Sequence, residues 1–64
     1  MEFAVESYCT GTSDVVEAED FDQAVRKVLP TNVDCYRVSD PRDCDVIVME
    51  IDDYMSERFY QVFA

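Results

Sequence analysis

Carboxylates are the side chains of this sequence that could take part in chemistry. The 64 residues include 15 Asp and Glu, 5 Lys and Arg, and no His. Without His there can be no Ser–His or Cys–His nucleophile pair, so acid–base catalysis would depend on carboxylate pairs such as Asp43 with Asp45. With so many acids such pairs arise by chance, and a domain of this length has little room for a substrate pocket of several hundred Å³. We therefore expect that the protein is not an enzyme.

Metal and cofactor sites are not indicated either. A zinc site usually needs four Cys or His ligands, whereas this chain has 3 Cys and no His. The acidic segment 40–45 lacks the glycine and the ligand spacing of an EF-hand loop. We expect no cofactor and no metal site.

The cysteines and the hydropathy pattern bear on the cellular compartment. Cys9, Cys35 and Cys44 are an odd number and form no Cys-x-x-Cys pair, which favours reduced thiols over a disulfide framework. The alternative is a disulfide between Cys35 and Cys44 across a hairpin. No secretory signal and no apolar run of membrane-spanning length is apparent. The expected location is the cytoplasm, which would be that of the host cell if a phage encodes the protein.

The charge balance is the strongest functional signal. The formal net charge is −10 at pH 7 and the sequence pI is about 4.1. A magnitude of roughly 2 to 8 keeps a small domain soluble, and a higher density of like charge destabilises the compact state. Nucleic acid and anionic membranes repel such a protein, so we expect no direct contact with either and predict a basic partner. The alternative is an acidic proteome, in which every protein surface has this character.

One segment, Asp20–Leu29, has the pattern of an amphipathic helix. Its apolar residues recur at i, i+3, i+4, i+7 and i+8 and form one helical face: Phe21, Ala24, Val25, Val28 and Leu29. Asp20 is predicted to cap the first turn, Gln23 to reach back to it, and Pro30 to end the helix. A helix of about ten residues is marginal alone in water, so this face must be buried against the rest of the chain.

The remaining segments favour strands. Residues 1–9 alternate with Phe3 and Val5 on the inner face, and a turn around the only glycine leads into a second strand at residues 14–19. A third strand is predicted at residues 33–39. The turn predicted at Ser39–Asp43 would join it to the next strand in a second hairpin. The apolar run at residues 44–51 predicts a central strand covered on both faces.

The C-terminal segment, residues 54–64, fits two structures. Met55, Phe59, Val62 and Phe63 match a helical stripe, whereas the aromatic and β-branched residues from Arg58 to Phe63 are typical of a strand. The helix is favoured. The sequence thus predicts one α+β domain, residues 1–64, with a small antiparallel sheet (β-β-α-β-β), a helix packed on one face, and a C-terminal helix or strand.

The first half of the chain resembles known small proteins. The hairpin followed by the segment 16–28 (VEAEDFDQAVRKV) is similar to a pattern in very small proteins of phages and mobile elements, including the DpnD/PcfM-like group and some anti-CRISPR proteins. The resemblance implies a phage-type origin and transfers no functional residue.

Charge and resemblance together predict an acidic protein-binding inhibitor. Outward carboxylates on strands form a regular anionic array that can stand in for the phosphates of DNA. We predict a phage-type DNA mimic that occupies the basic nucleic-acid-binding groove of a host defence complex of the kind targeted by anti-CRISPR or anti-restriction proteins. The predicted partner-binding residues form a first group beside the central strand, Asp40, Asp43, Asp45, Glu50, Asp52 and Asp53, and a second group, Glu17, Glu19, Asp20 and Asp22.

Tyrosines are the other candidates for such an interface. Tyr8, Tyr54 and Tyr60 are possible amphipathic anchors, whereas Tyr36 is expected in the core. The alternative function is a small homo-oligomeric structural or assembly module with a solvating acidic surface. Such a homodimer would form through the aromatic segment Phe59–Phe63 or through an exposed sheet edge.

Overall fold

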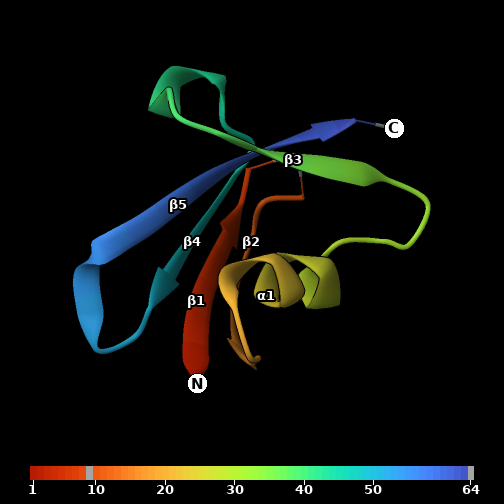
Figure 1. Cartoon of the computed structure of the whole chain (residues 1–64). Helices are drawn as coiled ribbons and strands as arrows, with labels where there is room; N and C mark the ends of the chain where they lie inside the picture. The colour runs from red at the N-terminus through yellow and green to blue at the C-terminus, as the bar shows by residue number, and fades with distance from the viewer. Residues whose placement is uncertain (9, 64) are drawn as a thin grey trace.

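A five-stranded antiparallel sheet with one α-helix on one face forms the fold (Figure 1). The computed structural model describes residues 1–8 and 10–63, apart from the side chain of Tyr54. The elements are β1 (Glu2–Ser7), β2 (Thr12–Glu17), α1 (Phe21–Val28), β3 (Asp34–Val38), the short 3-10 helix η1 (Pro41–Asp43), β4 (Val46–Glu50) and β5 (Asp53–Phe63). The strand order is β2-β1-β4-β5-β3. The predicted α+β class, with a small antiparallel sheet and a helix on one face, is confirmed.

The N-terminal hairpin follows the predicted alternation. β1 and β2 pair in register from Glu2 with Glu17 to Ser7 with Thr12. Phe3, Val5 and Ser7 are buried on one side of β1, while Cys9 lies outside the described residues. Gly11 in the connecting turn has φ of 69°, the left-handed conformation that glycine adopts without steric cost.

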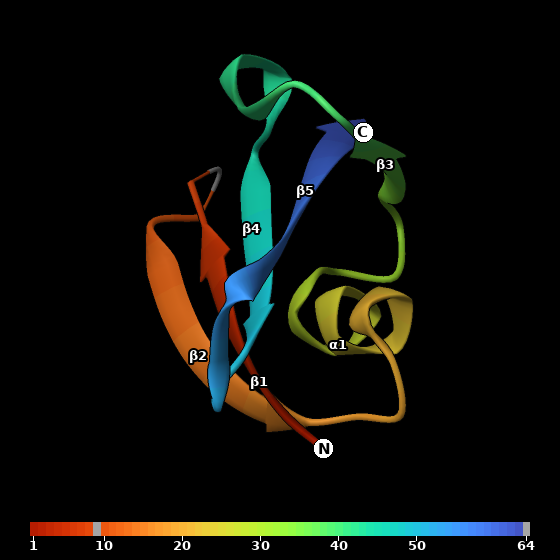
Figure 2. The same ribbon diagram turned by 60° about the vertical axis from the view of Figure 1, so that its left-hand side comes forward.

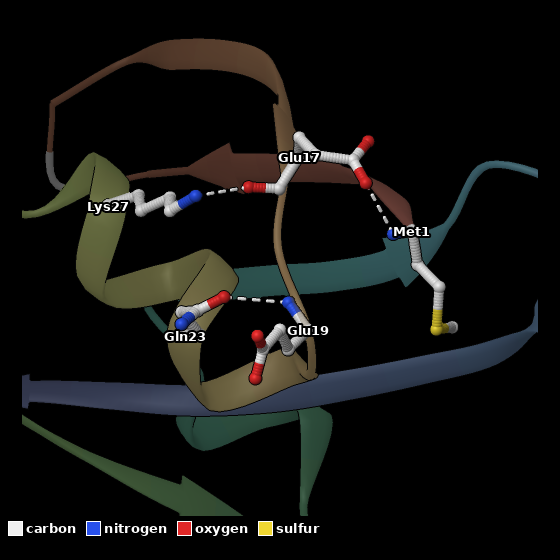
Figure 3. A network of polar contacts seen from close by, with 5 residues as sticks. All are labelled: Met1, Glu17, Glu19, Gln23 and Lys27. Carbon is white, nitrogen blue, oxygen red and sulfur yellow. Dashed lines mark hydrogen bonds and ion pairs between the residues drawn. The ribbon is translucent and has the colours of Figure 1, made fainter.

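Helix α1 begins and ends at the residues that the sequence indicates. Asp20 Oδ1 accepts from the Gln23 backbone N–H at 2.7 Å, and the helix ends where the Leu29 N–H donates to Val25 O at 3.1 Å. The reciprocal bond differs by one residue, because Gln23 Oε1 accepts from Glu19 N at 2.7 Å (Figure 3). Lys27 Nζ also donates to Glu17 O at 2.5 Å. Both ends of the helix are thus fixed to the segment that precedes it.

The core lies between α1 and the sheet. Ala24, Val25 and Leu29 of the predicted helical face are buried, and Phe21 and Val28 pack partly buried beside them. They meet buried strand residues from β1, β4 and β5, which are Phe3, Val5, Val46, Val48 and Tyr60. The Phe3 and Phe21 rings meet edge to face at 5.0 Å, and the Arg58 guanidinium lies 4.7 Å above the Phe21 ring.

The C-terminal segment is a strand, so the favoured helix is wrong. β5 pairs with β4 on one side and with β3 on the other, which places its aromatic and β-branched residues in the middle of the sheet. The predicted second hairpin is also wrong, because β5 lies between β3 and β4. The Ser39–Asp43 turn instead contains η1, which Asp40 caps by accepting from Arg42 N at 2.9 Å.

Strand β4 is central, as predicted, but is well covered on one face only. Val46 and Val48 are buried beneath α1, whereas Ile47 and Met49 on the opposite face are half-buried. Figure 2 shows α1 on one side of the sheet and no helix on the other. We call the sheet surface opposite α1 the open face.

Candidate acidic interface

The first group of predicted residues is divided between two ends of the sheet. Asp40, Asp43 and Asp45 belong to η1 and the residues that flank it, whereas Glu50, Asp52 and Asp53 surround the β4–β5 turn. Figures 1 and 2 show these two turns at opposite ends of β4. The five residues of β4 at about 3.3 Å each separate them by roughly 16 Å. They do not form one patch.

The half of this group at the β4–β5 turn lies near Glu17 of the second group. The start of β1 lies between the end of β2 and the end of β4, because Ala18 N donates to Met1 O at 2.9 Å and Ile51 N donates to Glu2 O at 3.2 Å. Glu2 is directly opposite Glu17 on β2. The structure therefore gathers carboxylates from three strand ends, including Glu2, which the sequence-based set omits.

Five of the ten predicted carboxylates accept hydrogen bonds from the backbone or a side chain, and a sixth, Glu17, pairs with the Met1 ammonium at 2.6 Å. Asp20 and Asp40 cap helices, Asp45 Oδ2 accepts from Val62 N at 2.8 Å, and Asp53 Oδ1 accepts from Met55 N at 3.0 Å. Asp22, the fifth, accepts from a tyrosine hydroxyl described below. Within the described residues, the carboxylates of Glu19, Asp43, Glu50 and Asp52 have no such bond. These four are the members of the set that remain free for a partner.

Tyr60 is a core residue and not an interface anchor. Its side chain is 2% exposed, and its hydroxyl donates to Asp22 Oδ1 at 2.5 Å, which joins β5 to α1. Burial, and then the bond to the Asp22 carboxylate, raise the pKa of the Tyr60 hydroxyl above its ordinary value near 10. Tyr36 shows the reverse: it was expected in the core but is exposed on edge strand β3. Tyr8 is exposed, as an anchor would have to be.

The raised pKa of Tyr60 predicts a loss of stability in alkali. Below pH 10 the hydroxyl is protonated in both states; above it the unfolded chain releases this proton more readily, so the free energy of unfolding falls as pH rises. Tyr60→Phe should remove this part of the decline, whereas Tyr8→Phe should retain it. Urea denaturation between about pH 9 and 11 measures the effect. An equally steep decline in Tyr60→Phe would refute the assignment.

The open face combines apolar and acidic side chains. Its apolar residues come from all five strands and include Ala4, Val15, Tyr36, Val38, Ile47, Met49, Phe59 and Phe63. The pairing register places five carboxylates among them, Glu2, Glu6, Glu17, Asp34 and Glu57. Neither arginine of the described strands lies on the open face. Arg37 pairs with Tyr60 and Arg58 pairs with Val48, and both of these partners face α1. The Met1 ammonium, 2.6 Å from Glu17 Oε1, is the cation at its border (Figure 3).

The basic side chains are mostly engaged elsewhere. Lys27, Arg26 and Arg58 donate to backbone carbonyl oxygens, at 2.5 Å for Lys27 to Glu17 and 2.8 Å for Arg26 to Val33. Arg42 pairs with Asp40 at 3.0 Å and so lowers the pKa of that carboxyl. This pair and the one between Met1 and Glu17 are the ion pairs found within residues 1–8 and 10–63. Most carboxylates are therefore not neutralised by the protein's own cations.

A hollow of about 380 Å³ lies between α1 and β3. Acidic and basic residues both line it, with Asp22 and Arg26 from the helix and Arg37 from the strand. The thiol of Cys35 also lines it, 3.7 Å from Arg26 Nη1. Arg26 is already bonded to Val33 O and Asp22 to Tyr60, so the polar groups here connect the helix to the sheet. We assign this hollow a structural role.

The described residues contain neither a metal-binding cluster nor a membrane-length helix. No group of three or more Cys, Asp or Glu among them is arranged to hold a metal ion. No described helix is long and apolar enough to cross a bilayer. Cys35 and Cys44 are both free thiols, so the alternative of a disulfide between them is wrong. Neither a protein-family model, nor a curated protein, nor a solved structure matches the chain.

Proposed function

We propose that this protein is an acidic inhibitor that binds the basic nucleic-acid-binding groove of another protein as a DNA mimic. The observation that carries the proposal is the lack of internal neutralisation: of the described carboxylates, only Glu17 and Asp40 have an ion-pair partner. Unneutralised charge destabilises the fold through self-repulsion, so a basic partner would relieve a cost already present in the free protein. The proposed activity is binding and not catalysis.

The charge density is in the range of nucleic acid. The net charge of −10 is spread over a longest dimension of 30 Å, or one charge per about 3 Å. A single strand of duplex DNA has one charge per roughly 3.4 Å of helix axis, and both strands together one per roughly 1.7 Å. A groove that binds a phosphate backbone would meet a comparable array on this protein. The partner class is therefore a basic nucleic-acid-binding protein, and the proposed setting is a phage-encoded inhibitor of a host defence complex in the cytoplasm.

The test is capture of the partner, with a variant of reduced negative charge for comparison. The tagged protein, and a variant carrying Glu2→Gln, Glu19→Gln, Asp43→Asn and Asp52→Asn, are incubated with a bacterial lysate and eluted with salt or duplex DNA. We expect the wild type to retain a basic nucleic-acid-binding complex that either eluent releases, and the variant to retain much less. These four carboxylates have no bond within the described residues, so the variant should fold. Recovery of the protein alone, in a salt-resistant form, would overturn the proposal.

A second candidate is a homo-oligomeric assembly module. The observation that favours it is an exposed aromatic pair at one edge of the sheet, where the Tyr36 and Phe63 rings meet at 5.6 Å. Strand β3 is also an edge strand, with β5 as its only neighbour. Sedimentation at low and high salt separates the two candidates, because an apolar self-interface should persist in high salt.

A further inference from the structure

In the described part of the chain, the open face has no covering layer like the one that α1 forms on the opposite face of the sheet (Figure 2). On the opposite side of the sheet, α1 covers Val46 and Val48 completely. On the open face the neighbouring β4 residues Ile47 and Met49 remain partly exposed, and Val15 is 60% exposed. An apolar sheet face is buried in a folded structure against a layer of helices or a second sheet. The open face therefore offers an apolar surface of the kind that a helix covers.

A shallow hollow marks the middle of this surface. Its volume is about 240 Å³, and its apolar lining comes from Ala4, Ile47 and Met49. The carboxylates of Glu6 and Glu57 line the same hollow and are exposed. Within the described residues neither of them has a bond. A Lys or Arg side chain would match this arrangement, because its aliphatic stem can lie on the apolar lining while its cationic end reaches a carboxylate.

We infer that the open face binds an amphipathic helix of the basic partner, with apolar residues on the β1–β4 surface and Lys or Arg side chains at Glu6 and Glu57. This inference rests on the proposed function, since it assigns the contact surface and the helical element of the same basic partner. Charge complementarity decides the occupant. A second copy of this chain would place the open-face carboxylates of both molecules in one interface without a Lys or Arg on either face.

Two charge-reversal variants test the assignment. Glu6→Lys alters the hollow, whereas Asp14→Lys alters an exposed carboxylate of the same hairpin outside it, because Asp14 pairs with Val5 on the α1 side. Both variants change the net charge by the same amount. The probe is a labelled amphipathic peptide of Leu, Lys and Arg, about 18 residues or roughly five helical turns. A scrambled peptide of the same composition is its control, and fluorescence anisotropy reports binding.

We expect the wild type to bind the amphipathic peptide at least about tenfold more tightly than the scrambled one. Glu6→Lys should weaken this binding at least about tenfold, and Asp14→Lys less than about threefold. Equal weakening in both variants, or equal affinity for both peptides, would overturn the open-face assignment while leaving a basic partner in place. If neither peptide binds and the lysate capture also yields no basic complex, the proposed function fails as well.

Discussion

Replacing Phe3 by Ala should remove most of the stability of this domain. Phe3 of β1 is fully buried, and its ring meets Phe21 of α1 edge to face. Truncation of a buried Phe to Ala typically costs about 3–5 kcal/mol. At roughly 0.05–0.15 kcal/mol per residue, a chain of 64 residues has about 3–10 kcal/mol in total. Urea denaturation followed by circular dichroism measures the loss.

Val15→Ala is the matched control for this prediction. Val15 lies in the same hairpin, but it is 60% exposed on the open face, so its truncation should change the free energy of unfolding by less than about 0.5 kcal/mol. A cost below about 1 kcal/mol for Phe3→Ala would mean that α1 does not pack on β1 as described.

The elements built from local signals were predictable from the sequence. The bounds predicted from the capped amphipathic segment agree with those of α1 to within one residue at each end. Asp20, Gln23 and Pro30 set these bounds because they act on neighbouring backbone groups. The alternation of Phe3 and Val5 gave the buried side of β1 for the same reason. Both depend on contacts that are close in sequence, or on a periodicity that a single segment displays.

The elements fixed by distant partners were not predictable in this way. The segment that became β5 fits a helical stripe as well as a strand, and its pairing with both β4 and β3 determines the outcome. Tyr36 alternates as a core residue would, but its side of β3 is the open face, which no helix covers. Tyr60 is a residue type that is common in interfaces, and only the fold shows that its hydroxyl is bonded to Asp22.

The candidate site shows the same limit. Asp45 and Glu50 are close in sequence, but an extended strand carries them to opposite ends of the sheet. Glu2 and Glu6 alternate with Phe3 and Val5 in the sequence, but only the structure places Ile47 and Met49 beside them. That neighbourhood arises from the β1–β4 pairing, between segments about forty residues apart, so no local pattern reveals the open face.

Salt should change folding and binding in opposite directions. Screening reduces the repulsion among unneutralised carboxylates, so the free energy of unfolding should increase with salt. The same screening weakens attraction to a basic groove, so partner affinity should fall by at least about tenfold between roughly 50 and 300 mM salt. An interface that is mainly apolar would show little change over this range. The opposite signs distinguish charge-driven binding from a general loss of structure at high salt.

The most direct measurement is therefore the affinity for the captured partner across this salt range, with urea denaturation at the same concentrations and duplex DNA as competitor. We expect affinity to fall while stability rises, and DNA and this protein to exclude each other from the partner. Affinity independent of salt, or a stable ternary complex with DNA, would refute the DNA-mimic proposal, because the carboxylates would then not occupy the nucleic-acid-binding groove.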